Sequence, residues 1–416
     1  MTDFIIHTFP NGLRLAYKQV ASTRIAHCGF TVDAGSRDEA ENELGLAHLI
    51  EHMLFKGTSK RRGNQVLNRL EVVGGDLNAF TSKDKTCIYA SIVDEHVDRA
   101  IELITDITFH SVFPEKELEK EKKVIADEID MYLDTPEERI FDEFQEFFYG
   151  NDPLGTNILG TKESLSAFRS HDLVQFRNHH YTALNTVFSF VGRLPLARLI
   201  RICEKYFGSI PTGRDLVPRK TFAGYHTFNK TRKMPFLQAH VLTGGLAYKL
   251  TDPLRPGLML LSNILGGPGL NSLLNLSLRE KHGFTYGVES SYQSFADTGL
   301  FNIYWSTDAR NLKKSVSIVN KELHEIMSNQ MSEYKLNKYK TQFKGQLIMA
   351  EEGKTGLMLM MGRSLLDLGK IDGLEEVLKT VESIGPEMLR EIANEVLTPL
   401  SQSWLIYEPN PNVIIS

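Results

Sequence analysis

The segment from Leu46 to Met53 constrains the fold more than any other part of this 416-residue chain. Its apolar residues recur at the spacing of one face of an α-helix, and they are Leu46, Leu49, Ile50 and Met53. His48, Glu51 and His52 stand at positions i, i+3 and i+4, so they share the opposite face of the same helix. The segment therefore predicts a short helix with a packing side and a chemical side.

The chemical side of this helix carries the groups of a hydrolytic metal site. His48 and His52 can bind one metal ion together, and Glu51 projects beside the position left open for water. The order of the three groups is the inverse of the commoner HExxH motif, with the same geometry. The alternative is that the three side chains are only solvated or hydrogen-bonded. A third ligand is needed to decide between the two interpretations.

Composition and charge indicate which classes of protein the chain can belong to. The length and the 42% of hydrophobic residues predict two or more domains with well-packed cores. A net charge of −5 gives no reason to expect nucleic-acid binding. The N-terminus lacks the basic head and apolar core of a signal peptide, and no apolar run is long enough to span a bilayer. With Cys28, Cys87 and Cys203 expected to be reduced thiols, the sequence predicts a soluble cytoplasmic protein.

The order of sequence features recurs in the second half of the chain, which indicates a duplication. Ala26-His27 recurs as Ala239-His240, and Gly45-Leu46 recurs as Gly257-Leu258. Phe188, Phe190 and Val191 likewise correspond to Ser403, Leu405 and Ile406. Weak shared patterning by coincidence is the alternative explanation.

The duplication predicts an α+β fold of two similar domains, each a mostly antiparallel β-sheet packed with α-helices. The domains are expected at 1–212 and 236–416, joined by an irregular, basic linker at 213–235. Only the first domain should bind metal, because the second has apolar or amide residues where the first has its three chemical groups. These replacements are Leu260, Asn263 and Ile264.

A long helical pattern from Pro114 to about Leu133 offers candidates for the third ligand. Glu121 and Glu128 are seven residues apart, so they point in nearly the same direction and border the apolar stripe. A carboxylate in such a place requires a cation or several hydrogen-bond donors. Zinc would provide the cation. The alternative is that Lys122 and Lys123 or a neighbouring segment solvate these carboxylates.

With these residues the chain resembles the pitrilysin and mitochondrial processing peptidase family of zinc metallopeptidases, the inverzincins, as a half-size bacterial-type member. In that family the third ligand is a glutamate 76 positions after the second histidine, and here 128 − 52 = 76. The family has a further glutamate seven positions before that ligand, as Glu121 is here. The resemblance implies that His48, His52 and Glu128 hold one Zn²⁺ per chain. Glu51 would be the general base, and Glu121 would support catalysis.

The resemblance extends to segments that would bind the substrate. Residues 74–81 resemble the family's edge strand, which implies that Asn78, Ala79 and Phe80 bind the peptide backbone. Arg279 and Tyr286, seven residues apart, match the family's signature in the second half. They would hold the substrate backbone and donate a hydrogen bond to the oxyanion. Taken alone, an arginine and a tyrosine at such positions are typical of a helix-end salt bridge and a sheet rim.

A preference for arginine near the cleaved bond is implied by Glu138 and Asp142. Processing peptidases that resemble this chain have an acidic pair at these positions, and a carboxylate pair binds a guanidinium strongly and selectively. The alternative is that the pair belongs to an ordinary solvated helix face, since the whole range 134–146 is acidic.

The expected function is that of a zinc endopeptidase that hydrolyses short or unfolded peptides inside a closed chamber. The expected assembly is a homodimer in which Arg279 and Tyr286 of one subunit complete the zinc site of the other. A heterodimer with a related chain is an alternative, and neither nucleic acid nor a membrane is an expected partner. The alternative function is that of a catalytically silent structural or partner subunit. Retention of every ligand, the base and the Arg/Tyr pair argues against it.

Overall fold

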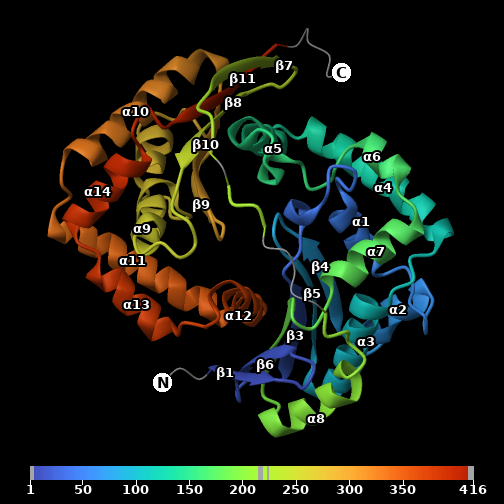
Figure 1. Ribbon diagram of the computed structural model, residues 1–416. Coiled ribbons are helices and arrows are strands. Elements are labelled where there is room, and N and C mark those ends of the chain that lie inside the picture. Colours follow the sequence, from blue (N-terminus) through green and yellow to red (C-terminus); the bar gives the residue numbers. More distant parts are fainter. Residues whose placement is uncertain (1–3, 214–218, 223, 411–416) are drawn as a thin grey trace. The chain divides into compact units, whose positions relative to one another are not determined.

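A computed structural model describes residues 4–213, 219–222 and 224–410 of the chain (Figure 1). The described residues form two compact units, and neither is continuous in sequence. Unit 1 draws on the ranges 1–131, 156–220 and 349–373. Unit 2 draws on 132–155, 221–348 and 374–416. Each unit therefore includes a helix from the opposite half of the chain.

The sheet of unit 1 has six strands among the described residues. They are β1 (Phe4–Thr8), β2 (Arg14–Gln19), β3 (Ile25–Val32), β4 (Asp76–Thr81), β5 (Thr86–Val93) and β6 (Thr186–Gly192). Their order is β1-β2-β6-β3-β5-β4, and β2 with β6 is the parallel pair in an otherwise antiparallel arrangement. A turn at Asn11-Gly12 joins β1 to β2, and Gly12 adopts a φ of 88°, which glycine tolerates without strain.

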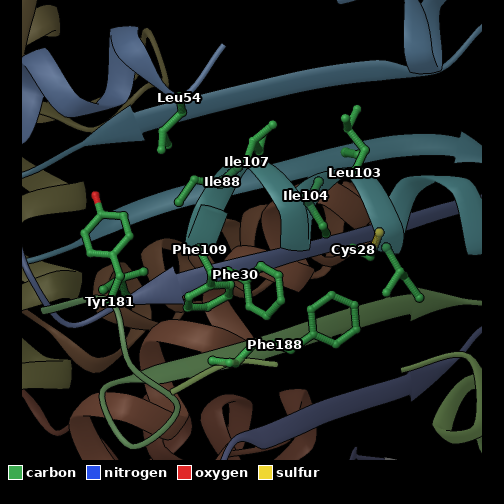
Figure 2. Packing of buried hydrophobic residues seen from close by; sticks show 14 of the residues in the cluster. Cys28, Phe30, Leu54, Ile88, Leu103, Ile104, Ile107, Phe109, Tyr181 and Phe188 are labelled. Carbon is green, nitrogen blue, oxygen red and sulfur yellow. The ribbon is translucent and has the colours of Figure 1, made fainter. Parts of the chain in front are cut away.

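Helices cover both faces of this sheet. The helices of unit 1 are α1 (Leu46–Met53), α2 (Gly63–Glu71), α3 (Val97–His110), most of α4 (Glu115–Asp134), α6 (Lys162–Ala167), α7 (Ser170–His180), α8 (Leu196–Phe207) and α12 (Lys354–Leu368). On one face α3 packs against β3 and β5, where Phe30 and Phe188 meet Ile104 in the core (Figure 2). On the other face α12 packs against β3 and β6. Gly362 permits this approach, since a Cβ there would lie 2.4 Å from the Thr31 hydroxyl.

Unit 2 has a five-stranded sheet among the described residues, in the order β7-β11-β8-β10-β9. Its strands are β7 (Asn229–Met234), β8 (Ala239–Leu246), β9 (Val288–Ser294), β10 (Gly299–Thr307) and β11 (Ser403–Pro409). Its helices are α5 (Pro136–Tyr149), α9 (Arg255–Gly266), a π-helix at Asn275–Glu280, α10 (Leu312–Ser328), most of α11 (Glu333–Glu352), α13 (Leu374–Ser383) and α14 (Pro386–Val396). Helix α5 packs against β8 and β11, and α9 packs against β9. Short 3-10 helices occur at Ser36–Asp38, Asp94–His96, Pro153–Gly155 and Ala309–Asn311.

The two sheets share one topology, which confirms the predicted fold class of two similar α+β domains. The order β2-β6-β3-β5-β4 in unit 1 corresponds to β7-β11-β8-β10-β9 in unit 2, and the first pair is parallel in both. Helix α1 follows β3 as α9 follows β8. Leu260 and Ile264 of α9 are fully buried, and Asn263 donates a hydrogen bond to Gln346. Helix α9 therefore uses for packing the positions at which α1 has its histidines.

The exchange of helices between the two halves is reciprocal. Helix α12, from the second half of the sequence, covers a face of the unit 1 sheet, and α5, from the first half, covers a face of the unit 2 sheet. In both halves the exchanged helix directly follows a 20-residue helix, α4 or α11. The exchange therefore repeats with the duplication.

The range 213–235, predicted as a linker, contains strand β7 and an ion pair between Arg219 and Asp38 in unit 1. Residues 214–218 and 223 of that range lie outside the described residues. Cys28, Cys87 and Cys203 are free and buried, as the sequence predicts. Among the described helices, none combines the length and the apolar character needed to cross a membrane.

Candidate metal and catalytic site

Helix α1 presents its two faces as the sequence predicts. Its four apolar residues, Leu46, Leu49, Ile50 and Met53, are fully buried in the core of unit 1. The helix begins at Gly45, whose φ is 90° and where a Cβ would lie 2.6 Å from the carbonyl oxygen of Leu159. Glycine at this position lets the helix begin in close contact with a neighbouring loop. The buried stripe directs the polar face of α1 toward α4.

His48, His52 and Glu128 converge on one point between α1 and α4. Their nearest ligand atoms all lie within 4.8 Å of one another. The His48 Nε2 atom is 3.9 Å from one Glu128 oxygen, and the His52 Nε2 atom is 3.6 Å from the other. The His48 and His52 rings are 4.7 Å apart between centroids. The fold therefore brings Glu128, the predicted third ligand 76 residues after His52, to the two imidazoles.

These three residues fit a zinc ion. Ligands at about 2.0–2.2 Å from a tetrahedral zinc are roughly 3.4 Å apart, close to the separations between the Glu128 oxygens and the two Nε2 atoms. Burial, with a smaller contribution from His52, lowers the pKa of His48 to about 3, so its imidazole is neutral at pH 7. Among the described residues, no lysine or arginine forms an ion pair with Glu128. A buried neutral imidazole, a second imidazole and a carboxylate match the donor set of a catalytic zinc site.

Glu121 lies on the far side of the His52 ring. Its Oε2 atom is 3.3 Å from His52 Nδ1, which leaves the Nε2 atom directed at Glu128. The side chain of Glu121 is buried, and its second oxygen pairs with Lys56 Nζ at 2.6 Å. A carboxylate behind a ligand histidine fixes the orientation of the ring and raises its basicity. Sequence reasoning missed Lys56, because it lies beyond the end of α1 at Met53, where helical spacing gives no signal.

Glu51 is the fourth group of the site and lies beside the convergence point. Burial raises the pKa of the Glu51 carboxyl, and Glu128 adds to this rise, while interactions with Thr81 and His52 oppose it. A carboxylate with a raised pKa is better suited to accept and return a proton near neutral pH. Thr81 is the last residue of β4, so the predicted base lies at the end of the predicted substrate strand.

Strand β4, which carries Asn78, Ala79 and Phe80, is an outer strand of the unit 1 sheet. Its only neighbour in the sheet is β5, so one row of backbone groups faces away from the described strands. Helix α1 packs beside β4. The Phe80 ring lies 5.2 Å from the Arg363 guanidinium of α12, which covers the other face of the sheet. Alternate residues of β4 therefore point toward α1 and toward α12.

The four remaining predicted residues belong to unit 2. Glu138 and Asp142 lie one helical turn apart on α5, and Glu138 is exposed. Arg279 lies in the last turn of the π-helix at Asn275–Glu280, and its guanidinium lies 5.2 Å from the Tyr286 ring. Tyr286 is 88% exposed, so its hydroxyl is accessible to a ligand. The structure brings the members of each pair together within unit 2.

The buried His48 gives the metal-free protein a specific acid sensitivity. The unfolded chain binds a proton at this imidazole near pH 6.5, whereas the folded chain does so only near pH 3, so stability falls as pH drops through that window. Each pH unit within the window costs about 1.4 kcal/mol for one such group. Between pH 6.5 and 5.5, the free energy of unfolding of the wild type should therefore fall by about 1 kcal/mol more than that of His48→Asn.

Urea denaturation of chelator-treated protein at several pH values measures this difference. His171→Asn is the matched control, because the His171 side chain is 69% exposed, and it should follow the wild type. Equal pH slopes for the wild type and His48→Asn would contradict the prediction.

Comparison with family models assigns both halves of the chain. Residues 14–162 match the model described as Insulinase (Peptidase family M16). Residues 167–343 match the model described as Peptidase M16 inactive domain. The two matches meet between residues 162 and 167. The first contains His48, His52 and Glu128, and the second contains none of these three residues.

Relatives and solved structures agree with these matches. YmxG of Bacillus subtilis strain 168, named as an uncharacterized zinc protease, is 34% identical over 393 residues, which cover 94% of this chain and 95% of that protein. ML0855 of Mycobacterium leprae strain TN, named in the same way, is 31% identical over 394 residues and covers 94% and 88% of the two chains. The crystal structure of a peptidase M16 inactive domain from Pseudomonas fluorescens has a TM-score of 0.91 at 20% identity, with 98% of each chain covered. A protease from Helicobacter pylori gives 0.89 at 20% identity over 98% of this chain and 99% of that one. The resemblance seen in the sequence is thus confirmed, and the chain belongs to peptidase family M16.

Proposed function

We propose that this protein is a zinc-dependent endopeptidase that hydrolyses short or unfolded peptides. The observation that carries the proposal is the convergence of His48, His52 and Glu128 within 4.8 Å, with the Glu51 carboxyl beside them. Relatives that cover nearly the whole chain are named zinc proteases, which supports the choice of metal and reaction. The proposal is one zinc ion per chain, and the single ligand group of this kind among the described residues supports it.

Each residue of the site has a different role in the proposed hydrolysis. When bound, zinc lowers the pKa of a coordinated water and polarises the carbonyl of the scissile peptide. Glu51 accepts the proton of the attacking water and passes it to the departing amine, for which its raised pKa is an advantage. Glu121 holds the His52 ring in place, and Lys56 keeps Glu121 in position through its ion pair.

The outer edge of β4 is the proposed binding strand for the substrate. A peptide added beside Asn78, Ala79 and Phe80 would form backbone hydrogen bonds, which bind many sequences and require an extended chain. Because β4 ends at Thr81, next to Glu51, such a peptide would pass the base. A folded protein does not offer a free strand of this kind, so unfolded segments and short peptides are the proposed substrates.

Two further features of the substrate and assembly are part of the proposal. Glu138 and Asp142 would bind an arginine near the cleaved bond, since two carboxylates one helical turn apart match a guanidinium. Arg279 and Tyr286 would bind the substrate backbone and the oxyanion. The chain retains both the zinc ligands and this Arg/Tyr pair, which favours a homodimer with a closed chamber over a division of roles between two different proteins.

The alternative of a silent structural or partner subunit predicts the loss of ligands, base or both. Here the ligands, the base and the supporting Glu121 are all present at interacting distances. The presence of these residues therefore argues against that alternative for this protein.

Replacing the base and replacing a ligand should have different consequences. Glu51→Gln keeps all three ligands, so it should bind zinc as the wild type does while turnover falls by about 10²–10⁴-fold. Glu128→Gln removes a ligand, so zinc and activity should be lost together. Bound zinc is measured by elemental analysis, and turnover by cleavage of an unstructured, arginine-containing peptide with and without chelator. Near-normal turnover of Glu51→Gln, or a wild type that neither binds zinc nor cleaves the peptide, would refute the proposed function.

Mixing two inactive variants tests the proposed homodimer. Glu51→Gln and Tyr286→Phe are each expected to be inactive or nearly so, for different reasons. If sites are completed across a twofold interface, half of the dimers are mixed after random exchange, and each has one intact site, which gives about a quarter of wild-type activity. Subunit exchange is verified with two differently tagged chains. No recovery after proven exchange would mean that the site is completed within one chain.

A further inference from the structure

Glu39 is a buried carboxyl near the site that the proposed mechanism does not use. It lies in the loop between β3 and α1, and only 8% of its surface is exposed. Its Oε2 atom accepts a hydrogen bond from the backbone N–H of Gly45 at 2.9 Å. Its Oε1 atom accepts one from the backbone N–H of Ala47 at 2.8 Å. Both oxygens of Glu39 are therefore bound to the beginning of the helix that carries the two histidines.

Among the residues that the structure describes, no other side chain caps the first turn of helix α1. Gly45 occupies the capping position and has no side chain, and the first turn of the helix contains no acidic residue. The first N–H groups of a helix have no partners within the helix, and a negative charge next to them is favourable. Glu39, six residues before the capping glycine, supplies acceptors for two of these N–H groups from outside the helix.

The surroundings hold Glu39 and the helix start in one position. Gly45 and Gly160 are back to back, because a Cβ on Gly160 would lie 2.3 Å from the carbonyl oxygen of Leu44. Lys83, just after β4, is buried and attracts the Glu39 charge. Burial raises the pKa of Glu39 to about 8, and the two N–H groups and Lys83 oppose the rise. Burial of a carboxyl costs free energy, so the protein forms this contact despite an unfavourable contribution to its folding stability.

We propose that Glu39 is a positioning residue for the metal site. By binding the N–H groups of Gly45 and Ala47, it fixes the axial position and rotation of the first turn of α1. His48 follows Ala47 directly, so a small shift of this turn would move its Nε2 atom away from Glu128. Glu39 thus acts through the helix backbone and touches neither the metal nor the substrate. The inference rests on the proposed function only in requiring that zinc binds at this site.

Glu39→Gln tests this role with little change in size. The amide keeps one acceptor, while its NH₂ group faces a backbone N–H donor, so one of the two hydrogen bonds is lost. Glu43→Gln is the matched control, because Glu43 lies in the same loop and accepts a hydrogen bond from Ala40 N–H at 2.9 Å. Zinc affinity is measured by competition with a chelator, and ligand geometry by the visible spectrum of the Co²⁺-substituted protein. Circular dichroism reports on folding.

The expected result separates the two variants. Glu39→Gln should bind zinc about 10–100-fold more weakly, as for other residues that orient metal ligands, and its Co²⁺ spectrum should change. Its kcat should fall while KM stays close to that of the wild type. Glu43→Gln should match the wild type in all of these measurements.

A folded Glu39→Gln with lower thermal stability but wild-type zinc affinity and Co²⁺ spectrum would overturn the inference, because the contact would then only stabilise the fold. If Glu39→Gln does not fold, Glu39→Asp is measured, which keeps the carboxyl group but is one methylene too short to reach both N–H groups. Wild-type zinc affinity in that variant would likewise overturn it. A wild type that binds no zinc would instead refute the proposed function, so the two failures are distinguishable.

Discussion

The orientation of helix α1 is the constraint on which the whole candidate site depends. Burial of its four apolar residues removes each side chain from water, at about 1.5–3 kcal/mol per residue. Any rotation that turned His48 and His52 away from α4 would expose part of this stripe and lose several kcal/mol. The packing side of the helix therefore sets the direction of the chemical side. In α9, the positions that correspond to the two histidines hold a buried leucine and a buried isoleucine, so this helix has no chemical side.

The carboxylates around this helix have different neighbouring groups, and each is therefore suited to a different role. Glu121 has the Lys56 ammonium, and Glu39 has two backbone N–H groups. Glu128 lies 3.9 and 3.6 Å from the two imidazoles, of which that of His48 is kept neutral by burial, so a metal cation would be a favourable partner for this carboxylate. Glu51 is left with a raised pKa and a position at the end of β4. A site of this composition is chemically suited to bind a divalent ion and to transfer a proton.

The sequence predicted the parts of this arrangement that depend on local spacing. The i, i+3, i+4 pattern of α1 and the seven-residue spacing of Glu121 and Glu128 fix which side chains share a helix face. The pairing of α1 with α4 came from the family resemblance, because helical periodicity cannot show which distant helix supplies a ligand. The shared topology of the two sheets confirmed the duplication inferred from scattered matches.

Features that depend on contacts between distant segments were not predictable in this way. The reciprocal exchange of α5 and α12 has no local signal, since both helices are amphipathic or apolar enough to pack on either sheet. The cap by Glu39 was missed because its residue lies outside the usual capping positions of α1. Strand β7 was missed because a basic, exposed edge strand has the composition of a linker.

Anomalous X-ray diffraction at the zinc absorption edge, from crystals grown with zinc at equimolar concentration, tests the central claim most directly. The account predicts one strong peak per chain at about 2.0–2.2 Å from His48 Nε2, His52 Nε2 and a Glu128 oxygen, with a water as fourth ligand. No peak between α1 and α4, or zinc bound at this site with Glu128 outside the coordination sphere, would contradict it.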